Sequence, residues 1–134
     1  MDWFIKWRND VEYLSIRLVR GNHDILNRKF YSTAGIDVSE DQWLEHPFCF
    51  THDIELKCND DLIAKNSYTF SGHIHPGIKI NGIGKQTLRF PCFYFTKDFA
   101  ILPAFSRFTG LASIHPAFED KIFALVEKNV IEIQ

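Results

Sequence analysis

Three apolar runs in this chain each lead directly into a short polar segment that contains histidine. The runs and the segments that follow them are 14–20 with Gly21-Asn22-His23-Asp24, 47–51 with His52-Asp53, and 67–71 with Gly72-His73-Ile74-His75. Short apolar runs bounded by turn residues are typical of buried β-strands. In open α/β sheets, ligands bind at the carboxyl ends of the strands. The pattern therefore constrains the chain to a fold in which three strand ends come together.

The rest of the sequence predicts an α/β beginning followed by a mostly β chain. Apolar residues at helical spacing predict a helix over 2–12; they are Trp3, Phe4, Trp7 and Val11, with Asp2 as the cap. A second helix is expected over 25–33, ending at Gly35. Further strands are expected at 77–81, 87–96, 99–102 and 111–114, with a turn at 82–85 and a terminal hairpin of 118–127 and 130–134 that turns at Lys128-Asn129.

The length of 134 residues suits one domain with its own core, and no repeat or linker divides it. We therefore expect a single domain over 1–134. Its first expected element is a helix, whereas a parallel α/β unit normally begins with a strand. This order leads us to expect that the N-terminal part of the fold is absent from the chain.

Composition excludes several classes of protein. The net charge of −2 and the pI near 6.3 exclude a polycation. No run approaches the roughly 18 apolar residues of a membrane span, and the first residues do not resemble a secretory signal, so we expect a cytoplasmic protein without a membrane partner. The three cysteines are widely spaced and include no CxxC pair, which argues against a disulfide framework and against a structural zinc module.

The Gly21-Asn22-His23-Asp24 segment combines groups that suit metal and proton chemistry. The amide oxygen of Asn22 can ligate a cation, and His23 can serve as a general acid that Asp24 orients. Glycine allows the chain to turn sharply after a strand. The alternative is a plain turn, because Gly-Asn is a common turn pair.

Three further histidines, His52, His73 and His75, belong to the other two segments at the predicted strand ends. Imidazole is the commonest ligand for zinc, manganese and iron, and His73 and His75 in a loop can serve two adjacent ions. Taken singly, His73 and His75 also fit a polar loop that ends at Pro76, and His52 also fits an ordinary surface histidine. Their shared position at strand ends favours the joint metal site.

In this order, the three segments resemble the calcineurin-like metallophosphoesterase superfamily. Two later segments, LRFPCFYF at 88–95 and LPAFSRFTG at 102–110, are similar to the ligase-associated DNA damage response endonucleases, which are manganese-dependent phosphodiesterases. The resemblance implies an α/β fold, a metallophosphoesterase-type two-sheet β-sandwich flanked by helices, of which this chain would hold only the C-terminal portion.

The resemblance also implies a role for each residue. The metal ligands would be Asn22, His52 and His73 for one divalent ion and His75 for the other, with Mn²⁺ favoured and Zn²⁺ or iron as alternatives. His23 would be the general acid and Asp24 would orient it. The implied activity is two-metal hydrolysis of a phosphodiester by a DNA-repair endonuclease that acts on single-stranded DNA, and family association implies a DNA ligase and a helicase as partners.

The chain departs from the family pattern ahead of Gly21. The family places D-x-H and G-D there, and neither occurs in these 134 residues. Because carboxylates supply much of the charge that holds Mn²⁺, we expect the activity of this chain by itself to be weak. The alternative function is a non-catalytic protein-interaction scaffold on the same fold. The presence of every ligand in the half that the chain holds favours the enzyme.

Charge is unevenly distributed along the chain. Residues 1–67 carry a net charge of −4 and residues 68–134 a net charge of +2. Within 79–107, five lysines and arginines accompany one acid, Asp98. We expect Arg89 and Arg107 to bind a phosphodiester beside the metal loops. The alternative is an ordinary solvated sheet face.

Overall fold

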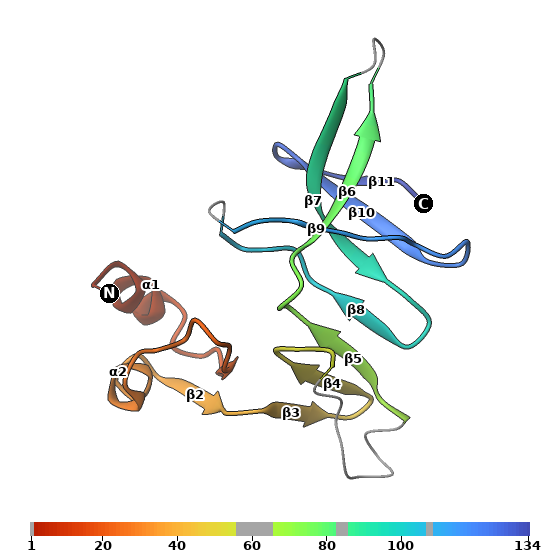
Figure 1. Cartoon of the computed structure of the whole chain (residues 1–134). Helices are drawn as coiled ribbons and strands as arrows, with labels where there is room; N and C mark the ends of the chain where they lie inside the picture. Colours follow the sequence, from red (N-terminus) through yellow and green to blue (C-terminus); the bar gives the residue numbers. More distant parts are fainter. Residues whose placement is uncertain (1, 56–65, 83–85, 107–108) are drawn as a thin grey trace.

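The structure, a computed structural model, describes residues 2–55, 66–82, 86–106 and 109–134 (Figure 1). In chain order the elements are α1 Asp2–Asp10, β1 Ile16–Val19, α2 Arg28–Thr33, β2 Ile36–Ser39, β3 Gln42–Glu45, β4 Phe48–Thr51, β5 Tyr68–Ser71, β6 Pro76–Asn81, β7 Thr87–Phe95, β8 Phe99–Ile101, β9 Ala112–Ser113, β10 Lys121–Val126 and β11 Asn129–Glu132. The expected mixed α/β architecture is therefore confirmed, and strands predominate.

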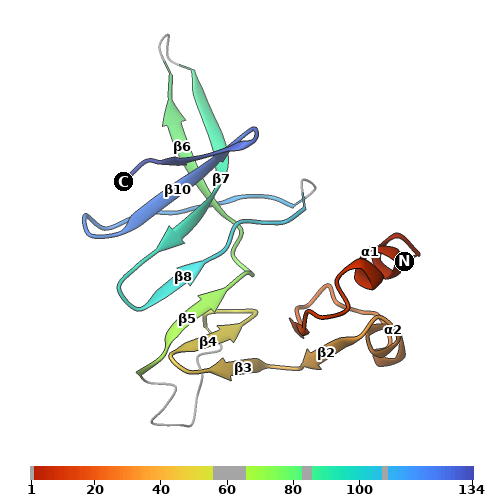
Figure 2. The same cartoon turned by 180° about the vertical axis from the view of Figure 1, so that it is seen from behind.

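The strands form one small sheet and one large sheet. β1 and β2 pair in parallel, with α2 as the crossover between them. The large sheet is mixed and has the order β11-β10-β7-β8-β5-β4-β3, and β6 and β9 join it through β7. Both helices lie at the same end of the molecule, with α2 next to β2, and β2 leads almost end to end into β3 (Figures 1 and 2).

β7 is the strand that joins the two parts of the large sheet. Its first half pairs with β6 through residues 87–91, whereas its second half pairs with β10 on one side and β8 on the other. The change of partners falls at Pro91 and Cys92. Proline has no N–H to donate to a ladder, so a proline suits the point where the pairing changes.

Aromatic side chains stack across β3, β4 and β5 on one face of the sheet. Trp43 stacks on Phe50 with ring centroids 5.2 Å apart, and Phe50 stacks on Phe70 at 5.4 Å. The three residues are direct neighbours in register, which is why their rings meet. The opposite face of the same strands carries Cys49, which is fully buried. This packing helps to fix the register of β4 and β5, whose ends carry the candidate ligands.

Several expected boundaries differ from the structure. The strands β2 and β3 were not expected, because IDVS and QWLE are short and their charged residues hide the alternation. α1 ends at Asp10 rather than at residue 12. α2 begins at Arg28 rather than at residue 25, because the side chain of Asn27 caps it by accepting from the Lys29 N–H.

The terminal hairpin and the cysteines also differ from expectation. The hairpin turns at Glu127-Lys128, one residue earlier than expected, and Glu127 takes the left-handed φ of +56° that this turn requires. Cys49 is disulfide-bonded, although the cysteine spacing argued against a disulfide framework, whereas Cys92 is a buried free thiol. The expected turn at 82–85 lies largely outside the described residues. No helix in the described part of the chain has the length and hydrophobicity needed to cross a bilayer.

The side chain of Tyr94 in β7 gives a test of the contact between this strand and the segment that precedes β10. Its hydroxyl donates to the carboxylate of the buried Asp120 at 2.7 Å, and the Ala117 N–H donates to the same oxygen at 2.7 Å. Burial, reinforced by the Asp120 carboxylate, raises the pKa of Tyr94 to about 12. We expect Tyr94→Phe to lower the free energy of unfolding by about 1–3 kcal/mol in urea titrations at neutral pH.

The raised pKa predicts how the contribution of Tyr94 to stability changes with pH. The pKa of Tyr94 is higher in the folded state than the unfolded value of about 10, so its contribution is complete below pH 10 and is lost as the pH rises toward 12. The difference between wild type and Tyr94→Phe should therefore shrink over that interval. The exposed Tyr13 supplies the control, because Tyr13→Phe should leave stability unchanged. A difference that stays constant with pH would contradict the role of the hydroxyl.

Candidate metal centre

The loops that follow β4 and β5 are held together by one backbone carbonyl. The carbonyl oxygen of His52 accepts from the Gly72 N–H at 3.2 Å, the His73 N–H at 2.9 Å and the Ser71 hydroxyl at 2.8 Å. The parallel register Thr51↔Ser71 brings these residues to the same level. His52 and His73 therefore leave the sheet side by side, as the strand-end argument predicted.

The segment after β1 is a tight turn closed by Asp24. The Asp24 N–H donates to the Gly21 carbonyl at 3.1 Å, and the Gly21 N–H donates to Asp24 Oδ2 at 2.8 Å. This pair of bonds exposes Asn22 and His23 at the tip of the turn. Asp24 thus supports the turn in this structure, and its expected role in orienting His23 stays a prediction.

Three candidate ligand atoms converge at the tips of these loops. His52 Nε2 lies 2.9 Å from Asn22 Oδ1 and 2.9 Å from His73 Nδ1. The family resemblance implied these three residues as ligands of one ion. They come from β1 in the small sheet and from β4 and β5 in the large sheet, so the site lies where the two sheets approach each other.

Hydrogen bonding alone does not satisfy this cluster. A neutral imidazole nitrogen carries either a proton or a lone pair. If His52 Nε2 carries the proton, it can donate to Asn22 Oδ1 but cannot accept from His73 Nδ1. If it carries the lone pair, it can accept from His73 but faces the lone pairs of Asn22 Oδ1. His52 Nε2 therefore cannot form both close contacts as full hydrogen bonds in either tautomer.

A divalent cation fits this donor set. Two imidazole nitrogens and an amide oxygen suit Mn²⁺, Zn²⁺ or Fe²⁺. In octahedral coordination, neighbouring donors about 2.1 Å from an ion lie about 3 Å apart, which agrees with the two 2.9 Å separations. Within the described ranges no group of three His, Cys, Asp or Glu side chains gathers at one point. The third donor here is the amide of Asn22, and no carboxylate is among the three.

The electrostatics of His52 favour the form that binds metal. Burial lowers the pKa of His52, and the neighbouring His73 lowers it further, while Asp24 and Asp53 act in the opposite direction. A lower pKa keeps the imidazole neutral, and only the neutral ring can donate a lone pair to a cation.

His75 adopts an uncommon backbone conformation beside the cluster. Its φ is +54°, in the left-handed region that non-glycine residues rarely occupy. Its carbonyl accepts from the Ala112 N–H at 3.0 Å, which ties the loop to β9. His75 is close enough to His52 for its charge to affect the pKa of His52, but it does not join the three converging atoms. It therefore stays a predicted ligand of the other ion.

The structure describes one of the two arginines that were expected to bind substrate. The guanidinium of Arg89 donates to the Leu111 carbonyl at 2.9 Å and to the Ser113 hydroxyl at 2.8 Å, so it also holds the strand β9 in place. Arg107 lies outside the described residues. Sequence reasoning missed Ser71 and the steric role of Gly21, although Ser71 directly precedes the Gly-His segment.

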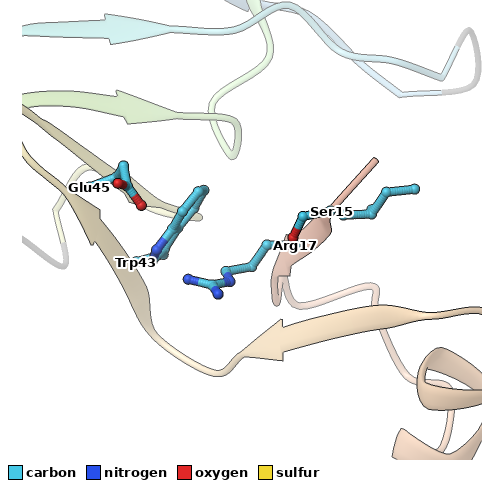
Figure 3. A pocket seen from close by; sticks show the side chains of 5 residues that line it. Ser15, Arg17, Trp43 and Glu45 are labelled. Carbon is cyan, nitrogen blue, oxygen red and sulfur yellow. The ribbon is translucent and has the colours of Figure 1, made fainter. Parts of the chain in front are cut away.

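A hollow lined by Ser15, Ile16, Arg17, Trp43 and Glu45 is separate from the metal centre (Figure 3). The Arg17 guanidinium lies 4.5 Å from the centre of the Trp43 ring, a cation–π contact. Ser15 precedes β1, whereas the candidate ligand Asn22 follows it. The hollow therefore faces the amino-terminal end of β1, away from the converging ligand atoms.

Comparison with known proteins shows a structural likeness to a nuclease. No protein-family profile and no curated protein matches the chain. The crystal structure of nuclease MPE from Pseudomonas putida is similar, with a TM-score of 0.73 and 27% sequence identity, over 98% of this chain and 60% of that one. The chain thus spans 60% of the length of the solved nuclease, and its fold is that of this part of a nuclease.

The space at Gly21 provides a test of the cluster. A Cβ added there would lie 2.7 Å from His52 Cε1 and from His52 Nδ1, closer than real contacts allow. We expect Gly21→Ala to turn the imidazole away and to weaken Mn²⁺ binding at least tenfold by isothermal titration calorimetry. Gly72→Ala is the matched control, because a Cβ at Gly72 meets nothing within 4 Å. Equal affinities for the two variants would show that the His52 ring does not depend on Gly21.

The left-handed residue His75 provides a second test. Alanine in this conformation costs about 1–2 kcal/mol, whereas glycine adopts it freely. We therefore expect the His75→Gly variant to be at least as stable as His75→Ala in thermal unfolding. At Gln42, an exposed residue of β3, the order should be the usual one, with glycine less stable than alanine. The same order at both positions would contradict strain at His75.

Proposed function

We propose that the chain forms part of a metal-dependent phosphodiesterase, a nuclease that acts on single-stranded DNA. The convergence of Asn22 Oδ1, His52 Nε2 and His73 Nδ1 is the observation that carries the proposal. The likeness to nuclease MPE supports the same class of reaction. In this proposal the fold is the C-terminal portion of a metallophosphoesterase-type two-sheet sandwich.

The three converging residues would hold one divalent ion, and Mn²⁺ is the ion we favour. His75 would contribute to a second ion. Such ions supply a nucleophilic water at neutral pH and neutralise charge on the phosphoryl oxygens. A DNA ligase and a helicase are the protein partners that the family resemblance suggests.

The residues of the chain have distinct tasks in this reaction. His23, exposed at the tip of the Gly21–Asp24 turn, would give a proton to the departing alkoxide oxygen. Asp24 keeps the turn closed through the Gly21 N–H. The His52 carbonyl keeps the loops of His52 and His73 at a fixed spacing.

The donor set also limits the metal affinity and the activity expected of the chain. All three converging ligands are neutral, and the 134 residues contain no D-x-H and no G-D. Neutral donors hold Mn²⁺ less tightly than carboxylates do. We therefore expect the isolated chain to bind metal but to hydrolyse phosphodiesters slowly.

The test measures metal binding and turnover in the same samples. We expect the isolated chain to bind Mn²⁺ in calorimetry, His73→Ala to lose that binding at least tenfold, and bis-p-nitrophenyl phosphate to be hydrolysed slowly. His46→Ala is the matched control, because His46 lies in the β3–β4 turn away from the cluster. Absence of Mn²⁺ binding by the wild type, or equal binding by His73→Ala, would refute the proposed site. Binding without any metal-dependent turnover would favour the scaffold.

A further inference from the structure

Two cations lie opposite each other on neighbouring strands close to the metal centre. Lys79 of β6 and Arg89 of β7 are direct partners in the antiparallel register, so their side chains share one face. Like charges in this position repel each other. Both side chains are exposed, and among the described residues no carboxylate lies within ion-pair distance of either one.

Arg89 is held across this face rather than extended into solvent. A Cβ at Gly77 would lie 3.3 Å from Arg89 Cγ and Cδ, so the aliphatic part of Arg89 passes over Gly77. Its guanidinium then reaches Leu111 and Ser113 on the far side of β6. Because only two of its five N–H donors are used in these bonds, Arg89 keeps donors for an anion.

Lys79 and a histidine line a hollow beside this arginine. The hollow lies between β6 and the segment 113–115, and its lining residues are Gly77, Ile78, Lys79, Ser113, Ile114 and His115. Ser113 is the register partner of Gly77 and also accepts from Arg89, so the arginine lies against the wall of the hollow. The lining therefore offers an ammonium group, a hydroxyl and an imidazole, and the Arg89 guanidinium is bonded to that hydroxyl. Together these groups suit a phosphate.

The hollow adjoins the candidate metal loop. His75 is two residues before Gly77, and the backbone of His75 is bonded to Ala112 next to Ser113. From His75 to Lys79 an extended chain covers at most about 13 Å, a distance that a few nucleotides of a single strand can span. A strand whose scissile phosphate lies at the metal centre would therefore carry a neighbouring phosphate into this hollow.

We propose that Lys79, Arg89, Ser113 and His115 form a phosphate-binding subsite that holds the nucleic-acid backbone a few nucleotides from the metal centre. The subsite rests on the proposed function, since it takes the same strand of DNA. It binds the sugar–phosphate backbone and therefore contributes affinity without sequence preference. The surrounding sequence agrees, because Asp98 is the only acid among residues 62–118.

The experiment measures binding without metal, so that it does not depend on the ligands. The full chain is titrated into a fluorescein-labelled oligothymidylate of about 16 nucleotides in EDTA, with anisotropy as the readout, over about 50–200 mM NaCl. We expect Lys79→Gln to weaken binding several-fold and to reduce the slope of log affinity against log salt by about 0.7–1. His115→Ala should weaken binding in the same direction.

Control measurements distinguish binding at this subsite from attraction by overall charge and from binding at the metal centre. Lys97→Gln removes the same charge at the β7–β8 turn, eight residues from Arg89, and should leave the affinity unchanged. The anisotropy titration in EDTA reports on the subsite without metal, whereas Mn²⁺ calorimetry reports on the metal ligands, so failure of the metal site and failure of the subsite are distinguishable.

Two results would overturn the subsite. The first is an equal loss of affinity in Lys79→Gln and Lys97→Gln, which would indicate attraction by overall charge. The second is preferential binding of an acidic peptide that displaces the oligonucleotide at equal charge concentration, which would indicate a protein partner instead.

Discussion

The carbonyl oxygen of His52 is the point on which the candidate site depends. It accepts three hydrogen bonds, from the Ser71 hydroxyl and from the N–H groups of Gly72 and His73. These bonds join the exits of two parallel strands whose register is already fixed by stacked aromatic rings on β3, β4 and β5. Backbone geometry therefore sets the spacing of the two imidazoles. The two imidazoles are thus held at a fixed spacing before any metal binds, which is the condition for an ordered metal site.

The same spacing is unfavourable for the polypeptide alone. Two imidazole nitrogens and an amide oxygen meet at 2.9 Å with too few protons to satisfy every contact, and His75 beside them holds a left-handed φ. Such local costs persist only where the surrounding structure enforces them, and they concentrate at functional sites. Core packing does not explain Asn22 or His73, because both side chains are exposed. A cation shared by the three donors would remove the conflict.

The sequence predicted the parts of the site that depend on local pattern. Short apolar runs followed by histidine segments identified the strands β1, β4 and β5, and the parallel pairing of β4 with β5 brings His52 and His73 to one edge. The assignment of Asn22, His52 and His73 to one ion came from the family resemblance. The sequence did not predict β2 and β3, whose few residues mix charge with apolar side chains. Nor did it predict that Arg89 would cross Gly77 to reach Ser113, or that Asp24 would close its own turn. Those contacts depend on which strands are neighbours, and neighbours far apart in sequence leave no local signal.

The absence of carboxylates among the donors links the two proposed sites. A divalent ion held by an amide and two imidazoles keeps its full double charge, whereas carboxylate ligands would cancel part of it. That charge would lie at the start of a strand that leads to Lys79 and Arg89, in a stretch of the chain with one acid. A phosphate backbone would then be the main source of negative charge for both sites. Metal and nucleic acid would consequently strengthen each other's binding by the same factor, since coupling free energy is reciprocal.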